Sequence, residues 1–138
     1  MYFIGIDLGT SAVKLLLMDE NGDIKKIVSR EYPIYFPKPG WSEQNPEDWY
    51  EQTKDGLREL IVDIDKEKVA GIGFGGQMHG LVVLDQEDKV IRPTILWNDG
   101  RTAGETEYLN QEIGKDKLSS YTANIAFAGF TAPKILWV

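Results

Sequence analysis

The sequence predicts a mixed α/β fold, and three features of its pattern lead to that prediction. Apolar, β-rich segments at residues 2–8, 12–18 and 24–36 follow one another closely, with turn residues between them. A helical stripe comes next, and further strand candidates follow that helix. Three strands joined by tight turns form an antiparallel meander, whereas strand–helix–strand order gives a β-α-β unit. We therefore expect a mixed sheet with flanking helices.

The first helix is predicted from the residues that follow the proline- and glycine-rich loop. Asn45 can cap its N-terminus, Pro46 suits the first helical position, and Glu47 and Asp48 lie at the positive end of the helix dipole. Spacings near four residues then place five side chains in one amphipathic stripe: Trp49, Thr53, Leu57, Leu60 and Ile61.

The second half of the chain predicts three more strands and a helix. The strands are a buried one at 69–76, its hairpin partner at 81–85 and another at 90–97. Asp99 is suited to cap a helix over about 101–113, which Gly114 would end. The order is therefore three strands, a helix, a strand, a hairpin and a helix.

The last residues predict the start of another helix that is not completed. Thr131 and Pro133 are typical of a helix N-terminus, yet the sequence stops five residues later on four apolar residues, 135–138. We expect from this that residues 1–138 form one lobe of a larger protein, truncated within a helix.

Composition excludes several classes of function. The net charge is −7 and the isoelectric point is about 4.7, which argues against a nucleic-acid or anionic-membrane partner but not against ATP. The absence of cysteine excludes disulfides, thiolate catalysis and cysteine-ligated zinc, and it fits the reducing cytoplasm, where we expect the protein. The N-terminus does not resemble a signal peptide, and no apolar run reaches the length of a membrane span.

The first chemical motif is DLGTSAVK at 7–14, between two predicted strands. Gly9 permits a tight turn, Thr10 and Ser11 bring hydroxyl groups, and Asp7 and Lys14 bring charges of both signs. Such a turn can hold phosphates and a hydrated Mg²⁺. By composition alone, a plain hairpin is the favoured interpretation. The stretch is neither a Walker A loop nor a GxGxxG turn.

The second and third motifs follow strand candidates. In GFGGQMHG at 73–80, Gln77 brings an amide, Met78 an apolar side chain and His79 an imidazole, a set suited to binding a polyol. A structural turn explains the same residues equally well. As the only histidine, His79 cannot anchor a usual zinc site. The stretch 95–102 combines side chains common in carbohydrate sites, with a helix cap at Asp99 and a core tryptophan as the alternative. They are Trp97, Asn98, Asp99 and Arg101.

Taken together and in this order, these stretches resemble the FGGY family of carbohydrate kinases. The matching stretches are GIDLGTSAVK, PKPGWSEQNPEDW, IGFGGQMHG, ILWNDGR and GFTAPKILWV, and they cover nearly all 138 residues. The resemblance implies two ribonuclease H-like (actin-like ATPase) domains with a deep cleft between them. This chain would be most of the N-terminal lobe, and its C-terminal lobe would be a missing partner.

The resemblance also assigns roles to individual residues. It implies that Asp7 lies near the transferred phosphate and, through water, the metal. The implied phosphate-binding residues are Gly9, Thr10 and Ser11, with Lys14 nearby. The implied sugar-binding residues are Gln77, Met78, His79, Trp97, Asn98 and Asp99. The family's general base lies beyond Val138, so neither Glu43 nor Asp99 is given that role, and the roles of Lys14 and Arg101 stay open.

The activity implied for the parent protein is transfer of the γ-phosphoryl group of ATP, with Mg²⁺, to the 5-hydroxyl of D-xylulose. The chain by itself is expected to be inactive, because half of its cleft and the base are missing. Two alternatives stay open: a family member that phosphorylates gluconate, ribulose or a deoxy sugar, and a non-catalytic actin-like nucleotide-binding domain. The sequence does not give the oligomeric state, and a homodimer is one arrangement to test.

Overall fold

The computed structural model describes residues 1–138, which divide into two compact units. Unit 1 comprises residues 1–33 and 46–77, and unit 2 comprises residues 34–45 and 78–138. The chain therefore leaves unit 1 after the third strand and returns to it at the first helix. Each unit has its own secondary structure and its own candidate site.

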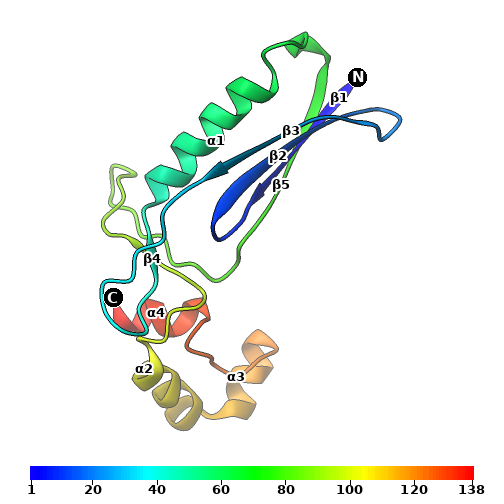
Figure 1. Cartoon of the computed structure of the whole chain (residues 1–138). Helices are drawn as coiled ribbons and strands as arrows, with labels where there is room; N and C mark the ends of the chain where they lie inside the picture. The colour runs from blue at the N-terminus through cyan, green and yellow to red at the C-terminus, as the bar shows by residue number, and fades with distance from the viewer. The chain divides into compact units, whose positions relative to one another are not determined.

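Unit 1 is built on a four-stranded sheet of order β3-β2-β1-β5 (Figure 1). Its strands are β1 (Tyr2–Leu8), β2 (Ala12–Asp19), β3 (Ile24–Glu31) and β5 (Val69–Gly76). Strand β2 runs antiparallel to both β1 and β3, whereas β1 and β5 are parallel. The mixed sheet and the antiparallel meander that the sequence predicts are thus confirmed.

Helix α1 (Pro46–Leu60) packs along β2 and β3, as Figure 1 shows. It begins at the predicted proline, with Glu47 and Asp48 in its first turn and Arg58 in its last, so its charges oppose the helix dipole. Strand residues, the tyrosine that follows β3 and one residue of α1 form the core: Ile4, Ile6, Val13, Leu15, Leu17, Val28, Tyr32 and Leu60. Burial of these side chains holds the helix on the sheet. A short 3₁₀ turn, η1 (Lys66–Lys68), leads into β5.

Two predictions for unit 1 need correction. The third strand ends at Glu31 rather than at residue 36, because Pro33 has no N–H to continue the ladder. Strand β5 forms where predicted but is not buried, since Ile72 and Phe74 are 50% and 77% exposed. As an edge strand it pairs only with β1, and α1 packs against β2 and β3 instead.

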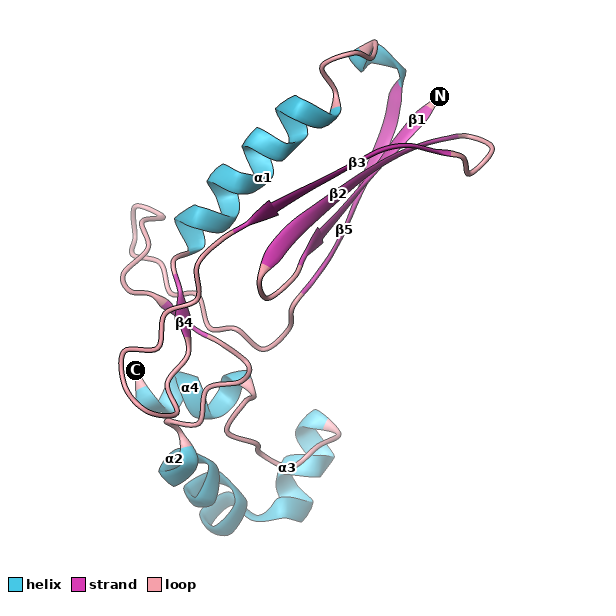
Figure 2. Ribbon diagram, viewed as in Figure 1, coloured by secondary structure: helices cyan, strands magenta, loops and turns pink.

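Unit 2 combines a two-stranded sheet with helices (Figure 2). The sheet pairs β4 (Glu43–Gln44) with β6 (Thr94–Ile95) in antiparallel register. The helical segments are α2 (Ala103–Tyr108), the π-helical η2 (Leu109–Gly114), α3 (Lys115–Thr122) and α4 (Thr131–Trp137). Helix α4 begins at the threonine that the sequence indicates. None of the helices combines the length and the apolar character that a membrane span requires.

The predicted strands of unit 2 are mostly wrong. Residues 81–85 do not pair with β5, because Asp85 folds them back onto the following segment. Its carboxylate accepts hydrogen bonds from the amides of Glu87 and Lys89, at 2.8 and 2.9 Å. Single bridges then join Leu84 to Val90 and Leu81 to Ile95. Within the predicted strand 90–97, only β6 is a strand.

The predicted helix over 101–113 begins slightly later than expected, at Ala103, and ends at Gly114 as predicted. Gly114 adopts φ 91°, a conformation that favours glycine and that interrupts the helix. A separate helix, α3, then follows from Lys115 to Thr122, which the sequence did not predict. The carboxylate of Asp99 accepts a hydrogen bond from the amide of Arg101, two residues ahead of α2, so it is not the cap of that helix.

Candidate functional site

Unit 1 carries the turn at residues 9–11 that joins β1 to β2. The amide of Gly9 donates to the carbonyl of Ala12 at 3.0 Å, and a Cβ on Gly9 would lie 2.9 Å from that oxygen, so the turn requires glycine. Tyr32 fastens the turn from the end of β3. Its hydroxyl donates to the carbonyl of Gly9, and its amide donates to the carbonyl of Ser11 at 3.2 Å.

Asp7 and Lys14 stand opposite each other in the register of β1 and β2, just before and after this turn. Both are exposed and alternate with the buried core residues, so they lie on the sheet face away from the core. Thr10 is half-buried and Ser11 is exposed. Burial, and to a lesser extent the charge of Asp7, raises the pKa of Tyr32 to about 12, so the tyrosine hydroxyl stays a donor.

A metal at this turn would have few protein ligands. Asp7 provides one carboxylate, and no group of three or more histidine, aspartate or glutamate side chains is placed to hold a metal ion. Mg²⁺ commonly keeps several waters and takes one or two carboxylates together with substrate phosphates. The residues present therefore fit a hydrated Mg²⁺ that is bound mainly through phosphate.

Unit 2 carries an aromatic cavity of about 250 Å³. It is lined by His79, Trp97, Phe127, Gly129 and Phe130. The imidazole of His79 stacks on Phe130, with ring centroids 4.2 Å apart and planes 18° apart. His79 has φ 64°, a left-handed conformation that is uncommon for a residue other than glycine. The cavity thus combines stacked rings with an imidazole that can exchange hydrogen bonds.

The other predicted sugar-site residues lie in different surroundings. Met78 is 67% exposed. The backbone N–H of Gln77 donates to the carbonyl of Leu8 at 2.8 Å, within unit 1. Asn98 lines a separate cavity of unit 2 together with residues 36–42. The structure therefore brings His79 and Trp97 together in one cavity, and it places Asn98 at another.

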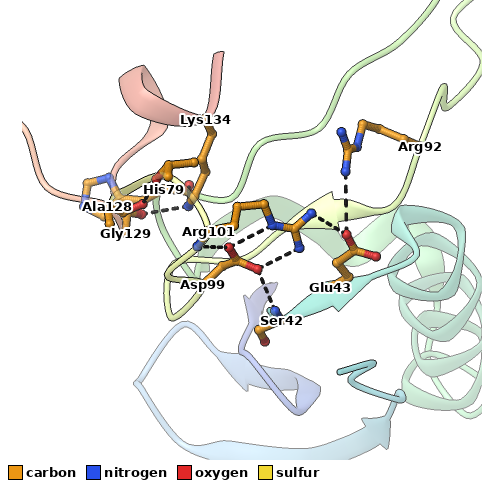
Figure 3. A network of polar contacts seen from close by, with 10 residues as sticks. Ser42, Glu43, His79, Arg92, Asp99, Arg101, Ala128, Gly129 and Lys134 are labelled. Carbon is orange, nitrogen blue, oxygen red and sulfur yellow. Dashed lines mark hydrogen bonds and ion pairs between the residues drawn. The ribbon is translucent and has the colours of Figure 1, made fainter. Parts of the chain in front are cut away.

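Asp99 is the centre of a buried polar network (Figure 3). Each of its carboxylate oxygens accepts two hydrogen bonds: Arg101 N and Nε reach Oδ1, both at 2.9 Å, and Ser42 N and Arg101 Nη2 reach Oδ2 at 2.6 and 2.7 Å. Burial opposes its ionisation, but the hydrogen bonds from Arg101 and Ser42 outweigh burial and hold the pKa of Asp99 below its usual value. These four bonds occupy the oxygens that a sugar hydroxyl would need.

Arg101 links this carboxylate to β4 and to two tryptophans. Its Nη1 donates to Glu43 Oε1 at 2.7 Å. Its guanidinium carbon lies 3.7 Å from the ring centroid of Trp41 and 5.1 Å from that of Trp137. Cation–π contacts of this kind strengthen when they are removed from water. Arg101 therefore holds unit 2 together, a role that the sequence left open.

The comparisons with known proteins agree with the motifs. The model of the N-terminal domain of the FGGY family of carbohydrate kinases matches residues 2–138. The chain belongs to this family. The FGGY kinase structures that it resembles have the actin-like ATPase fold, so the expected fold family is confirmed.

FGGY relatives with high similarity to this chain are named xylulose kinases. The xylulose kinase of Bacillus subtilis is 49% identical over 99% of the chain, which spans 28% of that protein. A xyloylose kinase from Brucella ovis, of known crystal structure, superposes with a TM-score of 0.90 and 42% identity over 100% of this chain and 29% of its own. The gluconokinase of Bacillus subtilis is 29% identical over 99% of the chain and 27% of its own length.

Two residues of this FGGY domain that the sequence did not single out support the candidate sites. Tyr32 contacts the turn at residues 9–11, as described above. Lys134 is fully buried in α4, and its ammonium donates to the carbonyls of His79 and Gly129, each at 2.7 Å. Burial lowers the pKa of Lys134 to about 8, while Asp99 raises it and Arg101 lowers it further. The only sequence signal for Lys134 is that it lies in the family-like stretch GFTAPK.

Proposed function

We propose that this chain is the N-terminal part of a longer kinase that transfers the γ-phosphoryl group of ATP to D-xylulose. The observation that carries the proposal is the 49% identity to a xylulose kinase over 99% of the chain. The chain spans less than a third of the length of that relative, so the remaining parts of the enzyme belong to the proposal as well. They include a C-terminal lobe, the adenine pocket and the general base. We place the enzyme in the cytoplasm.

The aromatic cavity of unit 2 is the proposed sugar subsite. Drug-sized ligands fill pockets of roughly 300–1,000 Å³, so a cavity of about 250 Å³ suits a smaller molecule such as a pentulose. Trp97 offers an apolar surface to the carbon chain, and His79 offers a hydrogen-bonding group to a hydroxyl. Gln77, Met78 and Asn98 remain proposed sugar contacts. For Asp99 we propose an indirect role, because its oxygens are already occupied.

The turn of unit 1 is the proposed phosphate site. Phosphoryl transfer depends mainly on alignment of the reactants and on neutralisation of charge. Backbone amides around Gly9, the hydroxyls of Thr10 and Ser11, and the cation of Lys14 would bind phosphate oxygens. Asp7 would hold Mg²⁺ through water, and the ion, when bound, neutralises phosphate charge. Tyr32 keeps the turn in shape by its hydrogen bond to Gly9.

A substrate panel on the full-length enzyme tests the proposal. ADP release would be measured with D-xylulose, D-ribulose, gluconate, a deoxy sugar and glycerol. We expect the highest kcat/KM with D-xylulose. A preference for gluconate would support the second candidate, which the 29% identical gluconokinase favours. Nucleotide binding without phosphorylation of any of these compounds would indicate a non-catalytic actin-like domain. Robust turnover by residues 1–138 alone would contradict the proposed division of the site.

Two aromatic variants test the sugar subsite. Trp97→Ala removes a cavity wall and should raise the KM for D-xylulose by about tenfold while the KM for ATP stays constant, since the proposed contact between the indole and the sugar is lost. Tyr121→Ala is the matched control, because Tyr121 is 74% exposed in α3 of the same unit and does not line the cavity. Equal effects of the two variants would remove the cavity from the proposal.

A further inference from the structure

Lys134 is buried in an unusual way. Its side chain has no exposed surface, yet its two hydrogen-bond partners are neutral backbone carbonyls rather than a carboxylate (Figure 3). Lysine is almost never fully buried without a partner of opposite charge, since burial removes the ammonium from water. The two carbonyls of His79 and Gly129 must therefore offset that cost, and the arrangement fixes both of them.

Each of the two carbonyls belongs to a wall of the aromatic cavity. His79 has a left-handed backbone, a conformation that costs free energy and persists only where its surroundings hold it. Gly129 packs on the backbone of Trp97 so closely that a Cβ would lie 2.3 Å from the Trp97 carbonyl oxygen. The Nζ atom of Lys134, which binds both carbonyls, thus joins the turn at His79 to the segment at Gly129 that packs on Trp97.

We propose that Lys134 is a positioning residue, which fixes the imidazole of His79 over Phe130 by binding the carbonyl of His79 and that of Gly129. It does not contact the ligand of the cavity. It acts through the backbone of the two walls, and its hydrogen bonds keep the stacked geometry of His79 and Phe130 in the absence of ligand. The consequence for sugar binding rests on the proposed function, whereas the consequence for His79 does not.

Thr102 provides a matched control for the proposed role of Lys134. The hydroxyl of Thr102 donates to the carbonyl of Ala128 at 2.9 Å, so Thr102 also anchors the segment before Phe130 from a fully buried position. The side-chain hydrogen bonds at Thr102 join it to Ala128 and Thr106 and not to His79. If Lys134 only holds that segment in place, loss of either anchor should have the same effect on His79. If Lys134 positions His79, only its own loss should do so.

Proton NMR on the 138-residue chain tests the positioning directly, because His79 is its only histidine. In the wild type we expect the imidazole signals to be shifted by the ring of Phe130. Lys134→Met should move them toward the position of a free imidazole, and Thr102→Val should leave them in place. Equal shifts in both variants, or none in Lys134→Met, would overturn the proposal. If Lys134→Met does not fold, Lys134→Gln, which keeps a shorter donor, should give a smaller shift in the same direction.

Kinetics on the full-length enzyme tests the consequence for the sugar. Lys134→Met should raise the KM for D-xylulose about tenfold or more, as expected for loss of a hydrogen bond from a charged donor, with the KM for ATP unchanged. Thr102→Val should alter neither value by more than about twofold. A wild-type enzyme that does not phosphorylate D-xylulose would refute the proposed function, and the NMR result would still decide the positioning role. Unchanged sugar KM in an active Lys134→Met enzyme would refute the link to binding.

Discussion

Replacement of Arg101 by methionine should destabilise unit 2 strongly. The substitution removes three side-chain hydrogen bonds, two to Asp99 and one to Glu43, and the exposed fractions of the Arg101 and Asp99 side chains are only 1% and 0%. Removing one partner of a buried ion pair costs about 3–5 kcal/mol, because the other charge stays buried without compensation. The carboxylate of Asp99 keeps its hydrogen bonds from the backbone amides of Ser42 and Arg101. We therefore expect a loss of stability near the lower end of that range, about 3 kcal/mol.

Urea unfolding at neutral pH, followed by tryptophan fluorescence, measures this loss. The control is Arg58→Met, which breaks the exposed pair with Asp55 on α1 and should cost less than about 1 kcal/mol. A loss in Arg101→Met no larger than that of the control would refute the reasoning. The double variant Asp99→Asn/Arg101→Met should recover part of the stability, since the charge of Asp99 is then no longer buried without its ion-pair partner.

The pH dependence of the same variant gives a second check. In the wild type the folded pKa of Asp99 lies below its unfolded value, so the stability that it contributes is present above about pH 4 and is lost as the pH falls through the folded pKa. Without Arg101, burial should prevail and raise that pKa. The difference between wild type and Arg101→Met should therefore begin to shrink above about pH 4, as the pH falls through the raised pKa of the variant, and continue to shrink down to the lowered pKa of the wild type. A difference that stays constant with pH would contradict this account.

Three further outcomes are expected. Gly129→Ala should lower stability by about 1–3 kcal/mol in thermal unfolding, because its Cβ would overlap the carbonyl of Trp97; an unchanged Tm would argue against that contact. Tyr32→Phe should raise the KM for ATP severalfold in the full-length enzyme, since the turn at Gly9 loses its hydrogen bond; a change in the sugar KM instead would place Tyr32 elsewhere in the mechanism. The folded pKa of Lys134, about 8, lies below the usual 10.5, so the unfolded chain binds more protons between these values, and stability should rise with pH across that range in the wild type but not in Lys134→Met.

The sequence predicts the elements of unit 1 better than those of unit 2. Strands β1 and β2 are short apolar runs between turn residues, and α1 has a proline start and an apolar stripe, so local patterns suffice. The apolar residues of β5 cannot reveal that it is an edge strand, because its exposure depends on its neighbours. In unit 2 the turn at Asp85 decides the pairing of residues 81–91, and a pattern of apolar residues does not show which partner a strand will take.

For the candidate sites, too, the sequence shows the residue types but not the contacts that they make in the fold. Glycine-rich and aromatic stretches drew attention to His79 and Trp97, and the two residues line one cavity. No local pattern shows the contacts of Tyr32 or Lys134, because their hydrogen bonds reach across 23 and 55 residues of chain. For Asp99 the residue types suggested a sugar contact or a helix cap, whereas the fold surrounds its carboxylate with donors. Sequence patterns identify polar residues near a site more readily than they identify which oxygens are already occupied.

The interleaved paths of the two units have a consequence for synthesis on the ribosome. Residues 34–45 emerge early, between the two parts of unit 1, and within them only Tyr35 and Glu43 can form a bridge. Strand β4 cannot pair with β6 until β6 follows, and the side chain of Glu43 has no ion pair with Arg101 until that residue, 58 positions later, is made. Contacts so distant along the chain form late, because loop closure must come first. A nascent polypeptide that ends at Gln77 thus carries all of unit 1 and one segment of unit 2. A protease or chaperone that binds it meets residues 34–45 before β6, Asp99 and Arg101 have been made.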